Sequence, residues 1–421
     1  MSVKVYRYAA LFGAACAACL SSGQAAHGQT PAVGGQISLD DAFARSLGEA
    51  PILRAAEAAR EAAAAGVRQA DRALNPSINF MLENALGTGL YQGIDGTEAT
   101  FTFNQTLEWG GDREARTQLA VRQGERVRAT GDVARQTLLF DIEVAYIRAQ
   151  RAQADLLAAE QRLALAREVA ETVARRVEAA RDPLLAASRS DTLVAEAEIA
   201  VANARLADMT ARNQLAMYWS GGGDFQIDMS TFDDVSAVEI EGASLTPEIA
   251  VARAALQEAE ARIAVERARS TLDPTVSAGL RYFRNDSEVA FVVGFSIPLG
   301  VNDNNSAAVA RASAESAVAR IETEVLQRNI ERQVASARSQ MNIAAQEIAA
   351  IDQRLTPAAE EAVERARAGY AQGGFSYLDV LDAQRALTAA RLQRNSALES
   401  YHRARTALKR LLGGYASGSA Q

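Results

Sequence analysis

The feature that most constrains this chain is a stretch from Asp112 to Arg181 that contains no proline and only two glycines. At about 1.5 Å per residue, a helix over this stretch is roughly 100 Å long. Its apolar residues are spaced alternately three and four positions apart: Ile142, Ala145, Ala149, Ala152, Leu156, Ala159, Leu163, Ala166, Ala170, Val173, Val177 and Ala180. A sustained period of about 3.5 residues makes a helix pack along its length in a left-handed supercoil. The sequence therefore predicts a coiled-coil body that extends far beyond any compact core.

The chain also repeats itself at about half its length. Residues 72–77 (Arg-Ala-Leu-Asn-Pro-Ser) correspond to 270–275 (Ser-Thr-Leu-Asp-Pro-Thr), and 103–107 correspond to 295–299. Each Leu-(Asn/Asp)-Pro step ends a helix, because a residue before proline disfavours the α conformation. The second copy has its own heptad pattern, which Pro357 is predicted to kink. Its apolar positions are Ile330, Val334, Ala337, Met341, Ala344, Ile348, Ile351, Leu355, Ala358 and Ala362. A repeat of this size indicates a duplicated helix–strand–strand–helix unit rather than a solenoid.

Four segments alternate apolar and polar residues, at about 76–86, 97–109, 274–283 and 288–299. Their length of about 9–12 residues is what a tilted strand needs to cross a bilayer. A small soluble sheet packed on a helix is the alternative, because alternation alone does not distinguish the two. Four strands cannot close a barrel, so a membrane-spanning barrel requires several subunits that contribute four strands each.

These patterns divide the chain into five parts. We expect a signal peptide at 1–28, a first repeat at 29–220, a linker or equatorial segment at 221–246, a second repeat at 247–413 and a tail at 414–421. Long helices are predicted at about 112–181 and 185–219 in the first repeat, and at about 304–370 and 377–412 in the second.

The first 28 residues have the pattern of an export signal. Lys4 and Arg7 precede an apolar stretch from Ala9 to Leu20, and small residues follow. Both cysteines of the chain, Cys16 and Cys19, lie in this segment, so lipidation of either one is an alternative to simple cleavage. No later segment has about 18 consecutive apolar residues, which leaves a periplasmic, secreted or β-barrel protein.

Composition argues against several function classes. The formal net charge of −8 gives no electrostatic reason to bind nucleic acid. The two histidines, His27 and His402, form no Cys/His cluster that would offer a dedicated metal site. Neither a nucleophile-elbow motif nor a phosphate-binding loop occurs. The sequence therefore predicts a protein that is not an enzyme and holds no cofactor.

Two motifs resemble a known family. Residues 368–385 (AGYAQGGFSYLDVLDAQR) are similar to the turn at the periplasmic tip of TolC-like outer-membrane efflux proteins. Residues 104–116 (NQTLEWGGDREAR) resemble the strand-to-helix exit of that family's heavy-metal branch, the cobalt–zinc–cadmium type. In this motif Gly110 and Gly111 permit a turn off the strand, and Arg113 follows at the start of the long helix.

The resemblance implies both a fold class and a function. The implied fold is a mixed one, a membrane β-barrel continuous with a long α-helical coiled-coil barrel, in which three subunits form a 12-stranded barrel. The implied function is that of the outer-membrane channel subunit of a tripartite efflux system. Such a subunit is a passive homotrimeric duct, embedded in outer-membrane lipid, whose periplasmic helices dock on an adaptor protein and an inner-membrane RND-type pump.

Divalent heavy-metal cations are the substrates that the resemblance implies. Multidrug efflux and type I secretion are alternatives, because a wide duct need not discriminate among solutes that a pump selects. The alternative of another class is a periplasmic structural coiled coil without a pore.

The resemblance also suggests four gate residues. Asp379 and Asp382 match the family's aspartate gate, and in a trimer they would form rings of carboxylates that attract cations. A simpler role for an acid near a helix N-terminus is to cap that helix. Tyr370 matches a tyrosine that helps hold the tunnel closed, and Asp191 resembles its hydrogen-bonding partner. Phe375 stands where the drug-efflux archetype has an arginine, which predicts a wider resting entrance or a different latch.

The two turns at the far ends of the long helices are the expected contact surface for the adaptor. Exposed apolar residues at these turns would suit docking, with packing inside the trimer as the alternative. The residues are Pro183, Leu184, Leu185, Gly373, Gly374, Phe375 and Ser376.

Overall fold

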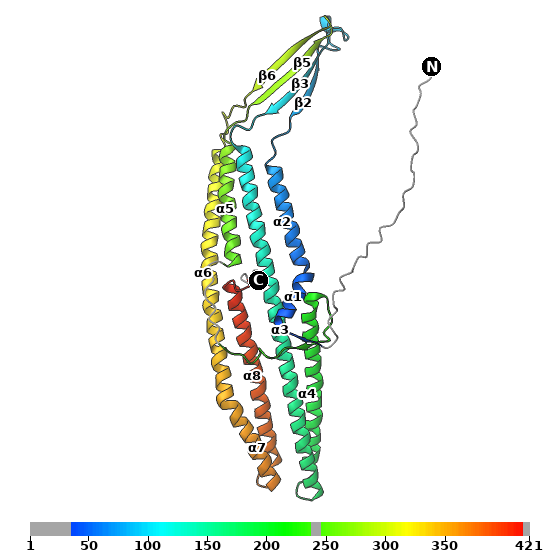
Figure 1. Ribbon diagram of the computed structural model, residues 1–421, viewed down its shortest axis with the longest axis vertical. Coiled ribbons are helices and arrows are strands. Elements are labelled where there is room, and N and C mark those ends of the chain that lie inside the picture. Colours follow the sequence, from blue (N-terminus) through cyan, green and yellow to red (C-terminus); the bar gives the residue numbers. More distant parts are fainter. Residues whose placement is uncertain (1–34, 237–245, 416–421) are drawn as a thin grey trace, which may run out of the picture.

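The computed structural model describes residues 35–236 and 246–415. The predicted signal peptide, with Cys16 and Cys19, lies outside these residues. The described chain is elongated: a four-stranded sheet occupies one end, and long helices extend from it to the other end (Figure 1). This arrangement agrees with the predicted fold class, in which a strand section continues into a long helical section.

The first copy is built around one unbroken helix. Its elements are α1 (Leu39–Glu49), α2 (Pro51–Ala70), α3 (Asp112–Glu178), α4 (Leu184–Ala216) and the short 3-10 turn η2 (Met217–Trp219). The helix α3 has 67 residues. It packs against α2 and α5 near the sheet and against α4 and α8 farther away (Figure 1). The heptad pattern thus produces a layer of parallel and antiparallel helices rather than a compact core.

The second copy differs from the first by a break in its long helix. Its elements are α5 (Pro247–Ala268), α6 (Ser306–Ala350), α7 (Thr356–Gln372) and α8 (Tyr377–Leu411). The helix predicted over 304–370 is interrupted by a π turn, η3 (Ile351–Leu355), which separates α6 from α7 just before Pro357, the residue predicted to kink it. Pro357 has no N–H to donate to the carbonyl of Gln353, and its ring would clash there, so the chain widens locally.

The sheet joins the strand pairs of both copies. Its order is β2 (Ser77–Glu83), β3 (Glu98–Thr106), β5 (Thr275–Phe283) and β6 (Glu288–Ser296), with every neighbouring pair antiparallel. All four strands are shorter than predicted, by one to three residues at an end. The ladder between β3 and β5 ends after Thr106: Leu107 N still donates to Pro274 O at 2.9 Å, but proline has no N–H to return the bond. Trp109 N donates instead to the Asp273 carboxylate at 3.0 Å. At the other end of β2, the positive φ of Asn84 ends the strand.

The register of the sheet gathers the large apolar side chains on one face. Ile78 pairs with Phe103, Phe101 with Leu280, and Leu280 with Phe291. These side chains are exposed in the single chain, and Phe291 reaches 88%. The opposite face carries mainly hydroxyl and amide side chains. None of the helices in the described ranges is long and apolar enough to cross a membrane.

A strap of residues 225–236 links the two copies on the outside of the helical layer. Within it β4 (Gln226–Ile227) pairs in parallel with β1 (Gln36–Ile37) over a core of α3 and α4 side chains. The strap then crosses α3, and Phe232 is buried among side chains of α6 and α8. The part of the predicted linker that the structure describes is therefore packed.

The predicted tail also begins with a packed residue. Tyr415 is buried, and its hydroxyl donates to Glu143 at 2.7 Å.

Candidate functional site

The two helical turns farthest from the sheet form a tip (Figure 1). One turn joins α3 to α4, and the other joins α7 to α8. The second turn depends on Gly373, whose φ of +83° lies in the left-handed region that favours glycine. The Gly374 N–H then donates to the Gly369 carbonyl at 2.8 Å. The Phe375 ring lies directly over Gly369, where a Cβ atom would come within 2.2 Å of the ring.

Three side chains connect the two turns, and we call them the tip latch: Arg176, Asp182 and Tyr370. The Arg176 guanidinium donates to both carboxylate oxygens of Asp182, at 2.8 and 3.2 Å. It also donates to the Tyr370 carbonyl at 2.8 Å, at the end of α7 where carbonyls lack helical partners. The Tyr370 hydroxyl donates to Asp182, and its ring lies 4.7 Å from the guanidinium carbon.

Hydrogen bonds and burial fix the protonation states of the tip-latch residues at neutral pH. Hydrogen bonds from Arg176 hold the pKa of Asp182 below its usual range, and the same bonds raise the pKa of Arg176. Burial raises the pKa of Tyr370, with its hydrogen bond to Asp182 as the next cause. The carboxylate is therefore charged and the phenol neutral, which is the protonation state that the three hydrogen-bonded contacts require.

The tip latch differs from the predicted pairing of Tyr370 with Asp191. Within the chain the tyrosine hydroxyl donates to Asp182, which follows α3 directly. Asp191 lies two turns into α4 and is exposed. Arg176 and Asp182 are not among the residues that the sequence pointed to. The one available signal was the Asp-Pro step that ends the first long helix.

The predicted gate aspartates have different environments. Asp379 caps α8: its carboxylate accepts from the Ser376 N–H and hydroxyl, both at 2.8 Å, and these bonds lower its pKa. Asp382 is one turn further on, with its side chain 76% exposed and 3.7 Å from Arg385. The capping role anticipated for such an acid thus applies to Asp379, and Asp382 projects into solvent.

The tip also presents apolar side chains to solvent. Leu184 is 79% exposed, and Leu185 and Phe375 are each more than half exposed. Pro183 precedes α4 as its N-cap residue, and Ser376 caps α8. Exposed leucine and phenylalanine side chains at a helical tip favour a contact with another protein.

The strand-to-helix turn at the other end of the body has its own geometric requirement for glycine. A Cβ atom on Gly110 would lie 2.8 Å from the Ala268 carbonyl oxygen, and Gly111 has a φ of +78°. Arg113 follows and pairs with Asp71 at 3.0 Å, which ties the start of α3 to the end of α2. The turn thus fixes the sheet onto the helical body.

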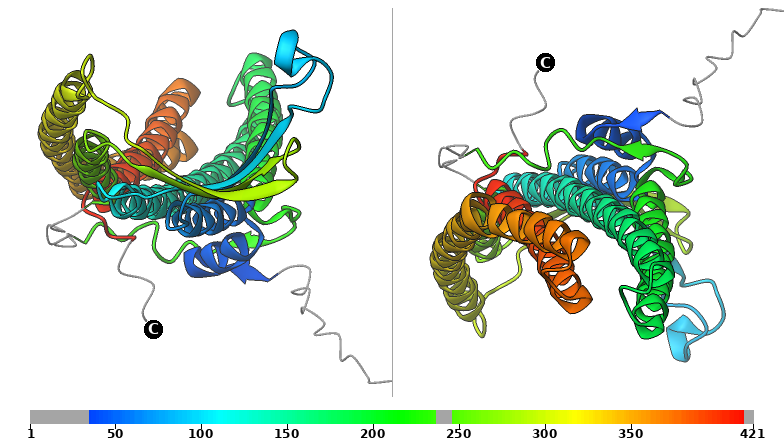
Figure 2. Two further views of the ribbon diagram at one scale, coloured as in Figure 1. Left: turned by 90° about the horizontal axis from the view of Figure 1, so that it is seen from above. Right: turned by 90° about the horizontal axis from the view of Figure 1, so that it is seen from below.

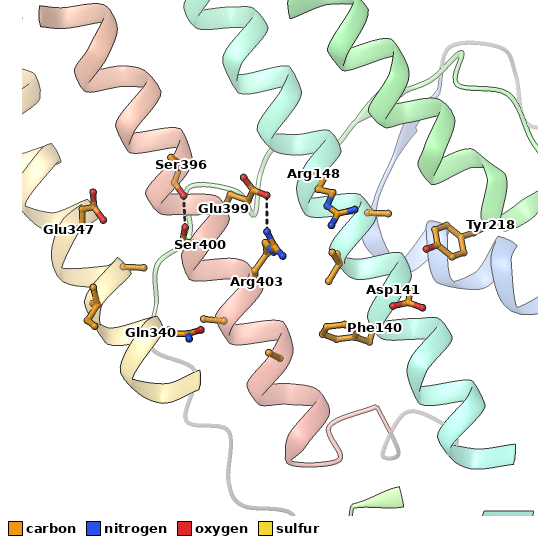
Figure 3. A pocket seen from close by; sticks show the side chains of 16 residues that line it. Phe140, Asp141, Arg148, Tyr218, Gln340, Glu347, Ser396, Glu399, Ser400 and Arg403 are labelled. Carbon is orange, nitrogen blue, oxygen red and sulfur yellow. Dashed lines mark hydrogen bonds and ion pairs between the residues drawn. The ribbon is translucent and has the colours of Figure 1, made fainter. Parts of the chain in front are cut away.

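The helices form a curved layer that has α1 on its convex side (Figure 2). A groove of about 910 Å³ lies between α3, α6 and α8 (Figure 3). Its lining mixes acids and bases, among them Asp141, Arg148 and Glu347, and Arg403 pairs with Glu399 at 3.6 Å. In the described ranges no three His, Cys, Asp or Glu side chains come together as a metal ion would require.

Comparison with known proteins identifies this architecture. The profile "Outer membrane efflux protein" matches residues 43–221 and again 243–414, one match for each copy of the duplicated unit. The chain belongs to the outer membrane efflux protein family. It is an outer-membrane efflux channel protein and not an enzyme, and its helical part lies in the periplasm. The resemblance inferred from the tip and the strand-to-helix motifs is thereby confirmed.

Curated relatives of this efflux protein are metal-resistance proteins. The cobalt-zinc-cadmium resistance protein CzcC of Cupriavidus metallidurans is 28% identical over 394 residues, which cover 90% of each chain. The nickel-cobalt-cadmium resistance protein NccC of Alcaligenes xylosoxydans is 30% identical and covers 69% of this chain and 68% of its own.

Solved structures share the fold of this efflux protein. The outer membrane protein VceC of Vibrio cholerae matches with a TM-score of 0.74 at 20% identity, covering 89% of this chain and 96% of its own. CusC, whose structures show conformational changes that accompany transmembrane channel formation, matches with a TM-score of 0.75 at 21% identity. The match covers 89% of this chain and 92% of CusC.

Proposed function

We propose that this efflux protein is the outer-membrane duct of a tripartite pump that exports divalent heavy-metal cations. The observation that carries the proposal is the sheet, whose exposed apolar face continues directly into a long helical body. An apolar strand face suits contact with lipid, and the polar face suits a water-filled pore. The metal-resistance relatives supply the substrate class.

The sheet also supports a closed ring of subunits. Its two edge strands, β2 and β6, have no partner on their outer sides in the described chain. Unpaired strand edges cannot remain in lipid, because their backbone groups would lack hydrogen bonds. Pairing β6 of one subunit with β2 of the next satisfies both edges and keeps the strands antiparallel. Three subunits then give the 12 strands of a barrel wide enough for a channel.

Exposed apolar side chains lie on both lateral edges of the helical body. On α6, the residues Val318, Ile321 and Val325 are each more than half exposed and lie on one helical face. On α4, at the opposite side of the helical layer, Ile199 and Leu206 are exposed in the same way (Figure 1). The two clusters lie at different heights: Arg320 of α6 pairs with Glu260 of α5 in the half toward the sheet, whereas Arg205 of α4 pairs with Glu160, far along α3 toward the tip. Each cluster therefore faces a different part of the neighbouring subunit. Contact between two different edges is a head-to-tail interface, and such an interface closes into a ring. A homotrimer is therefore the assembly that we propose.

The tip is the proposed periplasmic entrance. The tip latch holds the α3–α4 turn against the α7–α8 turn, and three copies would restrict the opening. Asp382 would add a ring of carboxylates that attracts cations. Asp379 would contribute its second carboxylate oxygen, because both of its capping bonds go to the other one. Leu184, Leu185 and Phe375 are the proposed contacts with a periplasmic adaptor, which in turn joins an inner-membrane pump.

Two experiments test the proposal. The full chain, extracted from outer membranes in detergent, should run as a trimer and give ion conductance in planar bilayers. A protein recovered as a soluble periplasmic monomer would overturn the channel assignment. A deletion strain should become sensitive to zinc, cadmium, cobalt or nickel and recover with the wild-type gene. Unchanged metal tolerance combined with new drug sensitivity would refute the metal substrate and leave the channel standing.

A further inference from the structure

The charges of the four strands are confined to one end of one face. Strands β2, β3, β5 and β6 contain four charged residues: Glu83, Glu98, Arg281 and Glu288. The register places Glu83 opposite Glu98, Glu98 opposite Phe283, and Phe283 opposite Glu288, so the three carboxylates share one row across the sheet. This row is the one farthest from the helices, and it lies on the face that carries the hydroxyl and amide side chains.

Arg281 lies in the next row and reaches into the carboxylate row. Its Nη1 donates to Glu98 at 3.1 Å, its Nη2 donates to Glu83 at 3.4 Å, and its Nε donates to the buried Thr100 hydroxyl at 2.9 Å. One guanidinium thus bridges three strands. Its side chain is 34% exposed, so the pairing is partly shielded from water.

The rest of that face is uncharged. The rows nearer the helices pair Ser77 with Asn104 and Asn79 with Thr102, and they continue through Ser277 and Gly279. The field along this stretch of the proposed pore is therefore set by the outer two rows. The two loops beyond these rows contain two acids, Asp95 and Asp286, and one base, Arg284. The net charge at this end of the sheet therefore stays negative.

An exported divalent cation would meet this row last. Carboxylates in one row, with no counter-charge, are good ligands for divalent cations. A duct needs the opposite property, because conduction requires that an ion enter readily and also leave. The Arg281 guanidinium already bonds to two of the three carboxylates. The row therefore still attracts cations electrostatically, but it does not offer a set of free carboxylates that could coordinate a cation.

We propose that Arg281 is a specificity-determining residue that keeps the outer mouth of the pore from trapping divalent cations. This inference rests on the proposed channel function. The two terminal nitrogens of Arg281 hydrogen-bond to Glu83 and Glu98, and the net charge of the row stays negative. The mouth then attracts cations and does not chelate them.

The test is block of conductance by Cd²⁺ in planar bilayers that contain the purified trimer in KCl. Wild-type channels should conduct K⁺ with little sensitivity to added Cd²⁺. The substitution Arg281→Gln should lower the half-blocking Cd²⁺ concentration at least ten-fold, because it releases two carboxylates. Arg281→Lys should give a smaller shift, since an ammonium keeps the charge but lacks the fork.

Two further variants make the result specific. Adding Glu83→Gln and Glu98→Gln to the Arg281→Gln variant should restore wild-type sensitivity, which also controls for a misfolded sheet. Asn79→Gln, on the same face but away from the charges, should behave as wild type. Conducting Arg281→Gln trimers with unchanged Cd²⁺ sensitivity would refute the inference alone. Absence of conductance from the wild-type protein would instead refute the channel.

Discussion

The tip latch makes a quantitative prediction about the closed entrance. Arg176 and Asp182 have side chains that are only 15% and 14% exposed. Replacing Arg176 with Gln removes both guanidinium bonds to Asp182 and leaves a nearly buried carboxylate with the Tyr370 hydroxyl. Breaking a buried ion pair on one side costs about 3–5 kcal/mol. Because these groups retain some contact with water, we expect about 3 kcal/mol, which is roughly a hundred-fold change in the equilibrium between latched and unlatched tips.

The matched control is Arg175→Gln, because Arg175 is the preceding residue and is exposed. The measurement is the fraction of time that purified channels spend in the high-conductance state in planar bilayers. Amide hydrogen exchange over residues 370–376 provides a second readout that does not depend on conductance. Arg176→Gln should increase both, and Tyr370→Phe should have a smaller effect of about 1 kcal/mol, since it removes one hydrogen bond. Equal behaviour of the two arginine variants would refute the latch.

The sign of the pH dependence follows from Asp182. Its pKa is lowered in the folded protein, chiefly by the bonds from Arg176. A carboxylate with a depressed pKa stabilises the latched state above its ordinary pKa of about 4, and this stabilisation is lost as pH falls through the lowered value. Latching by this group should therefore be constant between about pH 5 and 8 and weaken only in strong acid. Opening that tracks titration near pH 6.5 would contradict the assignment.

Two other predictions concern assembly and stability. Ile321→Asp places a charge in the proposed lateral interface and should shift detergent-extracted trimers to monomers on size exclusion, whereas Ile343→Asp, which lines the inner groove on the same helix, should leave them trimeric. Glu143→Gln weakens a buried carboxylate that accepts from Lys409 at 3.0 Å and from Tyr415 at 2.7 Å, and it should destabilise the folded protein by about 1–3 kcal/mol, read as a lower denaturation temperature. An unchanged denaturation temperature would mean that this cluster does not hold the end of the chain.

The sequence predicts the elements of this fold well where periodicity is local. The heptads of α3 and the alternation of the strands are visible within a dozen residues, so the existence and type of these elements follow directly. The alternation also identifies the apolar face of each strand, and the register joins the four faces into one surface. Strand ends were less predictable, because β3 ends where its partner strand presents Pro274, which has no N–H, and Asp273, both far away in the sequence.

The site was predictable only in part for the same reason. Tyr370 could be located from its motif, but its partner could not. Asp182 is separated from it by 188 residues, and no local pattern encodes which of several tip acids the folded tip brings close. The strap of residues 225–236 lacks a helical or strand periodicity, so only its position between the two repeats follows from the sequence. Its bonds are instead long-range ones, such as the donation from Gln150 to the Asp228 carbonyl at 2.7 Å.

The two copies of the duplicated unit share their elements but differ in stiffness, and this difference bears on how an entrance could open. In the first copy α3 reaches the tip without a break, whereas in the second the π turn at Ile351–Leu355 interrupts the path to α7. Arg394 of α8 brackets this turn, donating to Asp352 within it and to Asp233 of the strap, both at 2.6 Å. The tip latch holds the far end of α7. The segment α7 thus has the π turn at one end, and it is held by the Arg394 bonds at that end and by the tip latch at the other. Such a segment can rotate as a rigid body about the π turn when the tip latch is released. The unbroken α3 then provides the fixed frame, so we expect opening of the tip to move α7 together with the part of α8 that packs against it.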